Sequence, residues 1–170
     1  MIPLTVRLAT AVDVVPLFAI YNHYIATSFA TFDEQVKGAA EQNAWFQRYQ
    51  DNGRYRLFVA ERGDKVIGCA YSSPYRPHAA FSETVEVSAY LAPDARGAGV
   101  GTALYSELFR RLAHERLHRA VCAIALPNKP SIALHRRFGF RDVGVFNEYA
   151  LKNGIRASSL WMEKAMDGAW

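Results

Sequence analysis

The sequence predicts an α/β (α+β) fold in which a mixed sheet of about seven strands carries helices on both faces. Segments with the two-residue apolar period of strands and segments with helical period follow one another in the order β-α-α-β-β-β-α-β-α-β-β. That order is neither a strict strand–helix alternation nor an all-strand chain, so it favours a mixed sheet covered by helices. At 170 residues the chain has the length of one domain. We expect residues 1–166 to form this domain and residues 167–170 to be a short tail.

The first third of the chain predicts one strand and two helices. Thr5–Ala9 alternates polar and apolar residues, as a short strand does. A capping residue, Thr10 or Asp13, then begins a helix that runs to about position 24. A loop leads to a second helix over Gly38–Gln50, whose aromatic residues mark the buried side.

Three strands follow these helices. A turn at 62–64 joins Arg56–Glu61 to Lys65–Ser72, which predicts a hairpin. The next loop, Ser73–His78, holds two prolines, a tyrosine and an arginine, a composition that suggests a pocket wall. The third strand, Glu83–Leu91, places its polar residues on one face and its apolar residues on the other.

The second half adds a helix, a strand, a helix and a final hairpin. Apolar residues at helical spacing predict a helix over Val100–His114, and an apolar run predicts a strand at Arg119–Leu126. A helix capped by Asn128 comes next. The last two strands, Phe140–Leu151 and Ile155–Lys164, form a hairpin around an Asn-Gly turn.

Composition and charge argue against several classes of partner. The net charge is only +4 and the basic residues are interleaved with acidic ones, so we expect no nucleic-acid binding. No apolar run approaches the ~20 residues of a membrane span, and the N-terminus lacks the pattern of a signal peptide. We therefore expect a cytoplasmic protein with no membrane partner. Cys69 and Cys122 both lie in apolar runs, so we expect buried thiols.

The loop between the third of these strands and the following helix carries the strongest functional signal. Residues 96–102 read Arg-Gly-Ala-Gly-Val-Gly-Thr. A dinucleotide fingerprint requires glycine where Thr102 stands, and a P-loop requires a lysine, which is absent between positions 65 and 129. Two alternatives remain. One is the pattern [Arg/Gln]-x-x-Gly-x-[Gly/Ala], which Arg96, Gly99 and Gly101 satisfy, and the other is a glycine turn that only caps the helix.

The first alternative has a direct physical basis. Backbone N–H groups at a helix N-terminus, together with the helix dipole, attract phosphate oxygens without a metal ion. Gly99 and Gly101 would let the backbone approach a pyrophosphate closely because they have no Cβ. Arg96 would add charge-assisted hydrogen bonds. The loop is therefore a candidate site for a phosphate-bearing ligand.

Two later segments, together with this loop, carry a resemblance to a known family. The loop, the turn at Asn128 and the helix end Phe138-Gly139-Phe140 resemble the GNAT acetyl-CoA-dependent N-acetyltransferases over roughly Glu83–Phe140. Over nearly the whole chain, the sequence is most similar to the phosphinothricin and methionine sulfoximine–methionine sulfone acetyltransferase subfamily. The segments that carry this second resemblance are Ile20–Ser28, Ala70-Tyr71, Glu86 with Tyr90, Thr102–Tyr105, and Leu126–Ser131 with His135.

The resemblance implies a fold, a co-substrate and a set of binding residues. It implies a single GNAT-like domain with a mostly antiparallel sheet and a central splay between strands, which would admit acetyl-CoA without any metal. The residues expected to bind acetyl-CoA are Ser88, Ala89, Tyr90, Leu91, Arg96, Gly97, Ala98, Gly99, Val100, Gly101, Thr102 and Asn128.

Two residues are candidates for proton transfer. Glu86 lies in mid-strand on the polar face, where a carboxylate can take a proton from an ammonium through water. From the residues alone a surface glutamate on a strand is the favoured interpretation, and it is the resemblance that implies the catalytic role. His135 follows Asn128 by seven residues and is a candidate acid for the thiolate, a second base or a positioning group. Its alternative is a histidine on a helix surface beside two arginines.

The acceptor side is less well defined by the sequence. The resemblance implies a basic residue in the loop after Ala70-Tyr71, and Arg76 is therefore the expected partner of an anionic group on the acceptor. Arginine can bind a carboxylate or phosphinate with two hydrogen bonds. We expect Phe32 and Thr84 to line the same pocket. Phe81 stands where the resemblance implies a tyrosine, so a hydroxyl is missing there.

We therefore expect an enzyme that transfers acetyl from acetyl-CoA to the α-amine of a small amino-acid-like acceptor. Phosphinothricin, methionine sulfoximine and methionine sulfone are the acceptors that the resemblance implies, with Glu86 as general base and a homodimer as the assembly. Two alternatives stay open. One is transfer to another amine, such as a protein N-terminus or a polyamine, and the other is a non-catalytic sensor of acyl-CoA.

Overall fold

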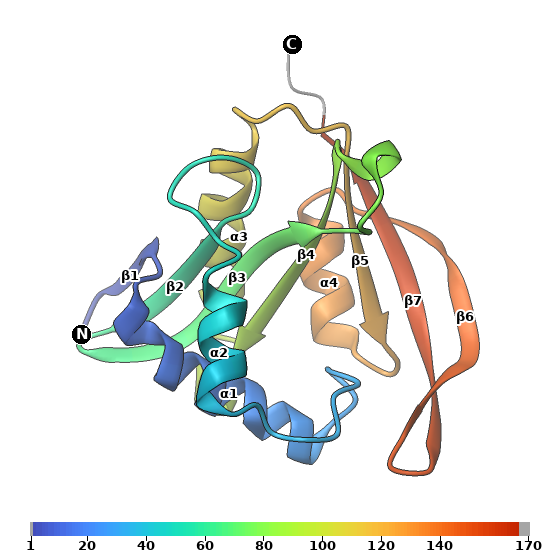
Figure 1. The fold of residues 1–170 in the computed structure, drawn as a ribbon, viewed down its shortest axis with the longest axis horizontal. Coiled ribbons are helices and arrows are strands. Elements are labelled where there is room, and N and C mark those ends of the chain that lie inside the picture. The colour runs from blue at the N-terminus through green and yellow to red at the C-terminus, as the bar shows by residue number, and fades with distance from the viewer. Residues whose placement is uncertain (1, 167–170) are drawn as a thin grey trace.

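The computed structural model describes residues 2–166, which form one seven-stranded sheet with helices on both sides (Figure 1). The strands are β1 (Leu4–Leu8), β2 (Leu57–Arg62), β3 (Lys65–Pro74), β4 (Thr84–Leu91), β5 (Arg119–Ala125), β6 (Arg141–Lys152) and β7 (Ile155–Ala165). The helices are α1 (Val14–Thr27), α2 (Ala39–Phe46), α3 (Val100–Leu112) and α4 (Lys129–Arg137), with short 3-10 turns η1 (Ala11–Asp13), η2 (Ala79–Phe81) and η3 (Pro93–Ala95). The strands lie in the order β1-β2-β3-β4-β5-β7-β6, and only β4 and β5 pair in parallel.

The predicted elements are confirmed, with shifts at their ends. The largest shift is in α2, which ends at Phe46 rather than at the predicted Gln50. Its last turn tightens, because the N–H groups of Arg48 and Tyr49 bond to carbonyls only three residues earlier. The predicted tail at 167–170 lies outside the described residues.

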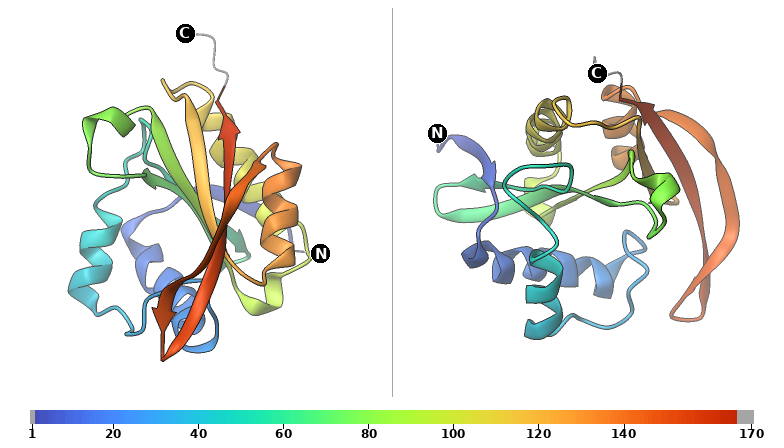
Figure 2. Two further views of the ribbon diagram at one scale, coloured as in Figure 1. Left: turned by 90° about the vertical axis from the view of Figure 1, so that its right-hand side faces the viewer. Right: turned by 45° about the horizontal axis from the view of Figure 1, so that its top comes forward.

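The four helices divide between the two faces of the sheet (Figure 2). Helices α1 and α2 lie on one face, and α3 and α4 lie on the other. Within residues 2–166, no helix is long and apolar enough to cross a lipid bilayer.

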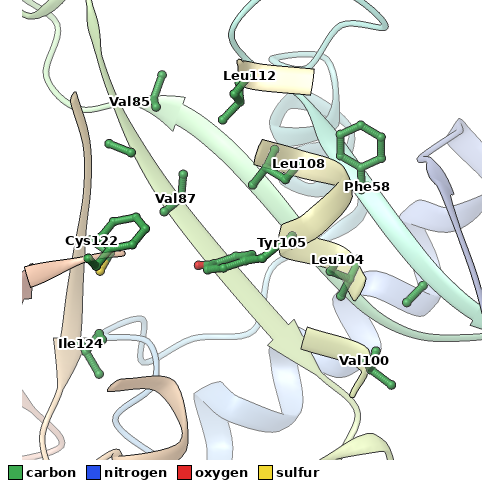
Figure 3. Close-up of a cluster of buried hydrophobic side chains, with 14 of the residues drawn as sticks. Phe58, Val85, Val87, Val100, Leu104, Tyr105, Leu108, Leu112, Cys122 and Ile124 are labelled. Carbon is green, nitrogen blue, oxygen red and sulfur yellow. The ribbon is translucent and has the colours of Figure 1, made fainter. Parts of the chain in front are cut away.

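The main core lies between α3 and the centre of the sheet (Figure 3). Val85 and Val87 of β4 are buried against apolar residues that recur at helical spacing along α3, including Leu104 and Leu108. On the outer side of α3, Glu107 accepts hydrogen bonds from two arginines. Cys122 of β5 belongs to this core, and Cys69 lies in a second cluster on the other face. Both thiols are buried, as predicted, and this burial raises the pKa of each to about 12, so both stay protonated at neutral pH.

The splay predicted for the sheet is present between β4 and β5. Their parallel pairing covers only Thr84–Glu86 opposite Arg119–Val121. Beyond Glu86, β4 stays paired with β3 as far as Leu91, and β5 stays paired with β7. The backbone edge of β4 that faces β5 is therefore unpaired after Glu86, which leaves a slot between two central strands (Figure 1).

The hairpin of β6 and β7 holds the loop that joins α1 to α2. Lys152 is only 2% exposed, and its ammonium donates to the carbonyls of Ser28 (2.6 Å) and Thr31 (2.9 Å). The backbone N–H of Asn153 donates to the Glu34 carboxylate at 2.6 Å. The tip of the hairpin thus fixes a loop about 120 residues earlier in the chain.

Candidate active site

The glycine loop after η3 forms the N-terminal end of α3. Gly97 and Gly99 have φ of +74° and +77°, a region that residues with a side chain rarely adopt. Gly99 is the residue that caps α3. Gly101 has a different reason to lack a side chain, because a Cβ there would lie 3.1 Å from Leu134 of α4. Its role in the structure is therefore the close packing of α3 on α4.

A large cavity opens where β4 and β5 separate, and the glycine loop forms part of its wall. We call it the cofactor cavity; its volume is about 1030 Å³. Three basic side chains line it, Arg96, Lys129 and Arg137, and no acidic side chain of the described residues does. An excess of positive charge beside a helix N-terminus suits a ligand with several phosphates.

Most of the residues predicted to bind acetyl-CoA meet in this cavity. Those that line it are Ala89, Tyr90, Leu91, Arg96, Gly97, Gly99, Val100, Gly101, Thr102 and Asn128, together with His135. Ser88 and Ala98 do not line it, although they are neighbours of residues that do. Sequence reasoning missed Lys129 and Arg137, because neither belongs to the glycine motif. Their position on α4, just after the Asn128 turn, was the available signal.

Arg96 and Asn128 are held in position by hydrogen bonds within the protein. The Arg96 guanidinium donates to the Tyr24 hydroxyl at 3.1 Å and lies over its ring. The Tyr24 hydroxyl in turn donates to the Leu91 carbonyl at 2.5 Å. Asn128 caps α4, with its side-chain oxygen accepting from the N–H of Ser131 at 3.2 Å. Its amide NH₂ group is not used by the cap and remains available to a ligand.

Glu86 lies at the point where β4 and β5 separate. Because side chains alternate along a strand, it points away from Val85 and Val87 and toward the face covered by α1 and α2. Its side chain is half-buried, and this burial raises the pKa of its carboxyl group. A carboxylate with a raised pKa is a better general base near neutral pH. The role as a base itself stays a prediction.

His135 is buried rather than lying on a helix surface, so that alternative is wrong. Its Nδ1 lies 2.8 Å from the Ser131 carbonyl, which can only accept, so Nδ1 carries the proton. Its Nε2 then accepts from the Tyr105 hydroxyl at 2.9 Å. Burial lowers the pKa of the ring. His135 is therefore a neutral imidazole with both nitrogens engaged, on the side of the slot that faces α3, and its catalytic role stays a prediction.

The residues predicted for the acceptor lie outside the cofactor cavity, and two of them, Arg76 and Phe32, contact a chain of aromatic rings. Arg76 is exposed and lies over the rings of Tyr75 and Phe81. Phe32 contacts Tyr149 edge-on, and Thr84 faces Arg119 in the parallel pair. The aromatic contacts that connect Phe32 with Phe81 run through Tyr149, Phe146, Trp161 and Tyr75. The sequence did not single out these hairpin rings, because β6 and β7 read only as strands.

These features together define a class of enzyme. The slot between β4 and β5, the basic cavity at a glycine-capped helix and the half-buried carboxylate at the slot are the parts of an acyl-CoA-dependent transferase. The size, positive charge and backbone donors of the cofactor cavity fit a coenzyme A derivative. Among residues 2–166, no group of three or more His, Cys, Asp or Glu side chains is placed to hold a metal ion.

Comparison with known proteins identifies the family. Residues 17–140 match the Acetyltransferase (GNAT) family, and the chain belongs to it. A phosphinothricin N-acetyltransferase of Streptomyces coelicolor is 41% identical over 163 residues, which are 95% of each chain. An L-methionine sulfoximine/L-methionine sulfone acetyltransferase of Pseudomonas aeruginosa is 32% identical, over 96% of this chain and 95% of that protein.

A solved structure extends this similarity. The structure of a GNAT superfamily phosphinothricin acetyltransferase from Sinorhizobium meliloti in complex with AcCoA has a TM-score of 0.89 and 34% identity. The match covers 97% of this chain and 89% of that one. The protein is thus an acetyl-CoA-dependent N-acetyltransferase with the mixed, mostly antiparallel sheet of its family.

Proposed function

We propose that the enzyme acetylates the α-amine of a small amino-acid-like acceptor, of the phosphinothricin, methionine sulfoximine or methionine sulfone type. The names of the similar proteins support this acceptor class. The observation that carries the proposal is Glu86, a half-buried carboxylate at the slot, on the face opposite α3 and α4. An acceptor would approach from that face, while the thioester arrives from the cofactor cavity.

Glu86 is the proposed general base. The acceptor ammonium gives a proton to the Glu86 carboxylate through a water, and the free amine attacks the thioester carbonyl carbon. A C–N bond forms and gives a tetrahedral intermediate, the C–S bond breaks, and the proton that the acetylated nitrogen loses is taken up by the leaving thiolate. The raised pKa of Glu86 brings it closer to that of the group it must deprotonate.

The unpaired edge of β4 and His135 have proposed supporting roles. Backbone N–H groups of the segment Ser88–Leu91 would stabilise the oxyanion and hold the pantetheine arm, because they have no partner on β5. Asn128 would hold the same arm with its free amide. His135, as a neutral imidazole beside Tyr105, would line the thioester end of the slot as the predicted second catalytic group.

Arg76, Phe32 and Thr84 are the proposed acceptor contacts. Arg76 lies at the rim of the aromatic chain, where its exposed guanidinium can meet a carboxylate. Phe81 is part of that chain through its contact with Tyr75, so its ring is used for packing although the expected hydroxyl is absent.

We further propose a cytoplasmic homodimer that works on a small molecule and on neither nucleic acid nor a membrane surface. The hairpin of β6 and β7 supports the dimer, because large apolar side chains are exposed along it: Val143, Val145, Phe146, Tyr149, Leu151 and Ile155. An exposed apolar patch of this kind marks a contact surface. Sedimentation velocity tests the dimer, and Leu151→Lys with Val143→Lys should give monomers.

The proposed function is tested by thiol release from acetyl-CoA over a panel of amines. Wild-type enzyme should release coenzyme A with phosphinothricin, methionine sulfoximine or methionine sulfone, and mass spectrometry should find the acetyl group on the α-nitrogen. Turnover confined to polyamines or to peptides with a free N-terminus would contradict the proposed acceptor class.

A further inference from the structure

A second cavity, of about 370 Å³, lies on the face of the sheet covered by α1 and α2. Five aromatic rings form much of its wall: Phe18, Tyr21, Trp45, Tyr71 and Tyr90. The rings pack on one another, with centroids 5.0 Å apart for Tyr21 and Tyr90 and 5.5 Å apart for Trp45 and Tyr71. Apart from Tyr90, which also lines the cofactor cavity, no residue of this aromatic cavity has a role assigned so far.

Charged groups also line the aromatic cavity, and most of them are paired. The Lys37 ammonium lies 3.3 Å from the Asp33 carboxylate and 3.9 Å from that of Glu41. Asp33 also accepts from the Tyr21 hydroxyl at 2.8 Å. With Arg48, these side chains carry two positive and two negative charges. The cavity therefore offers apolar rings and no net charge, which suits an uncharged apolar group.

The aromatic cavity is next to the proposed base. In the β3–β4 register, Tyr71 is opposite Ser88 and Ser73 is opposite Glu86, so Tyr71 and Glu86 are diagonal neighbours on one face. The charge of Glu86 contributes to the raised pKa of the Tyr71 hydroxyl, as expected for nearby groups. Tyr90 lines both the aromatic cavity and the cofactor cavity. One wall residue of the aromatic cavity, Tyr71, is thus a neighbour of the proposed base, and another, Tyr90, also lines the cofactor cavity.

We propose that the aromatic cavity holds the side chain of the acceptor, so that among the proposed acceptors the uncharged methionine sulfone and methionine sulfoximine are favoured over the anionic phosphinothricin. Among unmodified amino acids, the enzyme should favour apolar side chains the size of methionine, leucine or phenylalanine over smaller ones. This inference rests on the proposed amino-acid acceptor and assigns the residues that select among such acceptors. An amine beside Glu86 leaves its Cβ substituent within reach of the Tyr71 ring, and the cavity beyond is large enough for a phenyl group.

Ala44 allows the cavity to be filled without removing a core side chain. It is an exposed residue of α2 that lines the cavity, so Ala44→Trp should block it at little cost in stability. Wild-type kcat/KM should be at least ~10-fold higher for phenylalanine than for alanine, since single methylenes in apolar pockets change it by ~10–200-fold. In Ala44→Trp that preference should fall about tenfold.

The matched control is Asn43→Trp, the same substitution one residue earlier on α2. Asn43 is exposed and does not line the cavity, so this variant should keep the wild-type preference. A second readout needs no turnover. Calorimetric titration with N-acetylphenylalanine, the expected product, should show weaker binding to Ala44→Trp than to Asn43→Trp.

The outcomes separate this inference from the proposed function. If wild-type enzyme acetylates no amino acid, the proposed function fails and the inference fails with it. If it acetylates both amino acids and Ala44→Trp changes neither the preference nor the affinity for N-acetylphenylalanine, only the inference is overturned.

Discussion

The cofactor cavity and the aromatic cavity share Tyr90 as a wall, yet they are built by different means. The cofactor cavity uses backbone: a glycine-capped helix, an unpaired strand edge and a few basic side chains. The aromatic cavity uses side chains from two helices, two strands and a loop. Backbone recognition needs a short, fixed motif, whereas side-chain recognition can change residue by residue. The cofactor cavity should therefore stay specific for one co-substrate, whereas the choice of acceptor can change with single side chains of the aromatic cavity.

The largest effect should come from breaking the backbone of the cofactor cavity. Gly99→Val forces a β-branched residue into a left-handed conformation where acetyl-CoA phosphate should lie, so calorimetry should detect no binding. Gly154→Val is the control, because Gly154 has the same φ of +77° and the same open space, but lies in the β6–β7 turn. Acetyl-CoA bound equally by both variants would place the pyrophosphate elsewhere.

The next largest effect should come from Glu86, which stands between the cavities. Glu86→Gln keeps the shape of the side chain and removes the base, so kcat should fall by ~10²-fold or more. Acetyl-CoA affinity should stay within twofold of wild type, since Glu86 does not line the cofactor cavity. The wild-type rate should rise with pH through the raised pKa of Glu86, and this rise should vanish in Glu86→Gln. Near-wild-type turnover by this variant would remove Glu86 from the mechanism.

A moderate effect should come from the basic side chains of the cofactor cavity. Arg137→Gln should weaken acetyl-CoA binding about fivefold, the equivalent of about 1 kcal/mol for an exposed charge pair. The loss should shrink at high salt. Arg136→Gln is the control, because Arg136 is paired with Asp142 and does not line the cavity. An equal loss of acetyl-CoA affinity in both variants would mean that binding depends only on the net charge of the protein and not on Arg137 itself.

The smallest effect should be on stability. Since burial raises the folded-state pKa of Glu86, its ionised form opposes folding, and stability is lost as pH rises through that pKa. Glu86→Gln should therefore raise Tm by a few degrees at pH 8 and leave it nearly unchanged at pH 4, where the carboxyl group is mostly protonated in both states. Thermal melts at both pH values measure this. A lower Tm at pH 8 would mean that the charge is stabilised by contacts in the fold.

The difference between the two cavities also explains which parts of the site could be predicted from the sequence. The glycine loop followed from a motif, and the splay and most of the residues that line the cofactor cavity followed from the family resemblance carried by one continuous stretch, residues 83–140. Lys129 and Arg137 were missed because their role depends on where α4 sits against the loop. The contacts of His135 were missed for a similar reason. Its two ring nitrogens bond to Ser131 and Tyr105, and Tyr105 lies 30 residues away in the sequence.

The acceptor side was harder to predict because its walls come from distant parts of the chain. Tyr149, Phe146 and Trp161 meet Phe32 and Tyr75 only after the last hairpin has paired with β5. Trp45 and Tyr71 meet through the packing of α2 on the sheet. Periodicity identified each of these elements, but no local pattern records which rings will touch.

The bond from Lys152 to the loop of Ser28 and Thr31 also has a consequence for synthesis of the protein. Ser28, Phe29 and Ala30 of that loop line the cofactor cavity. Lys152, which holds the loop in place, is translated more than 120 residues later. A nascent chain that has left the ribosome as far as the end of α4 therefore contains the glycine loop and Glu86, but the loop of Ser28 and Thr31 is not yet anchored beside them. Contacts of such long separation form late in folding. The enzyme should thus acquire its activity only when the ribosome has released the C-terminal hairpin.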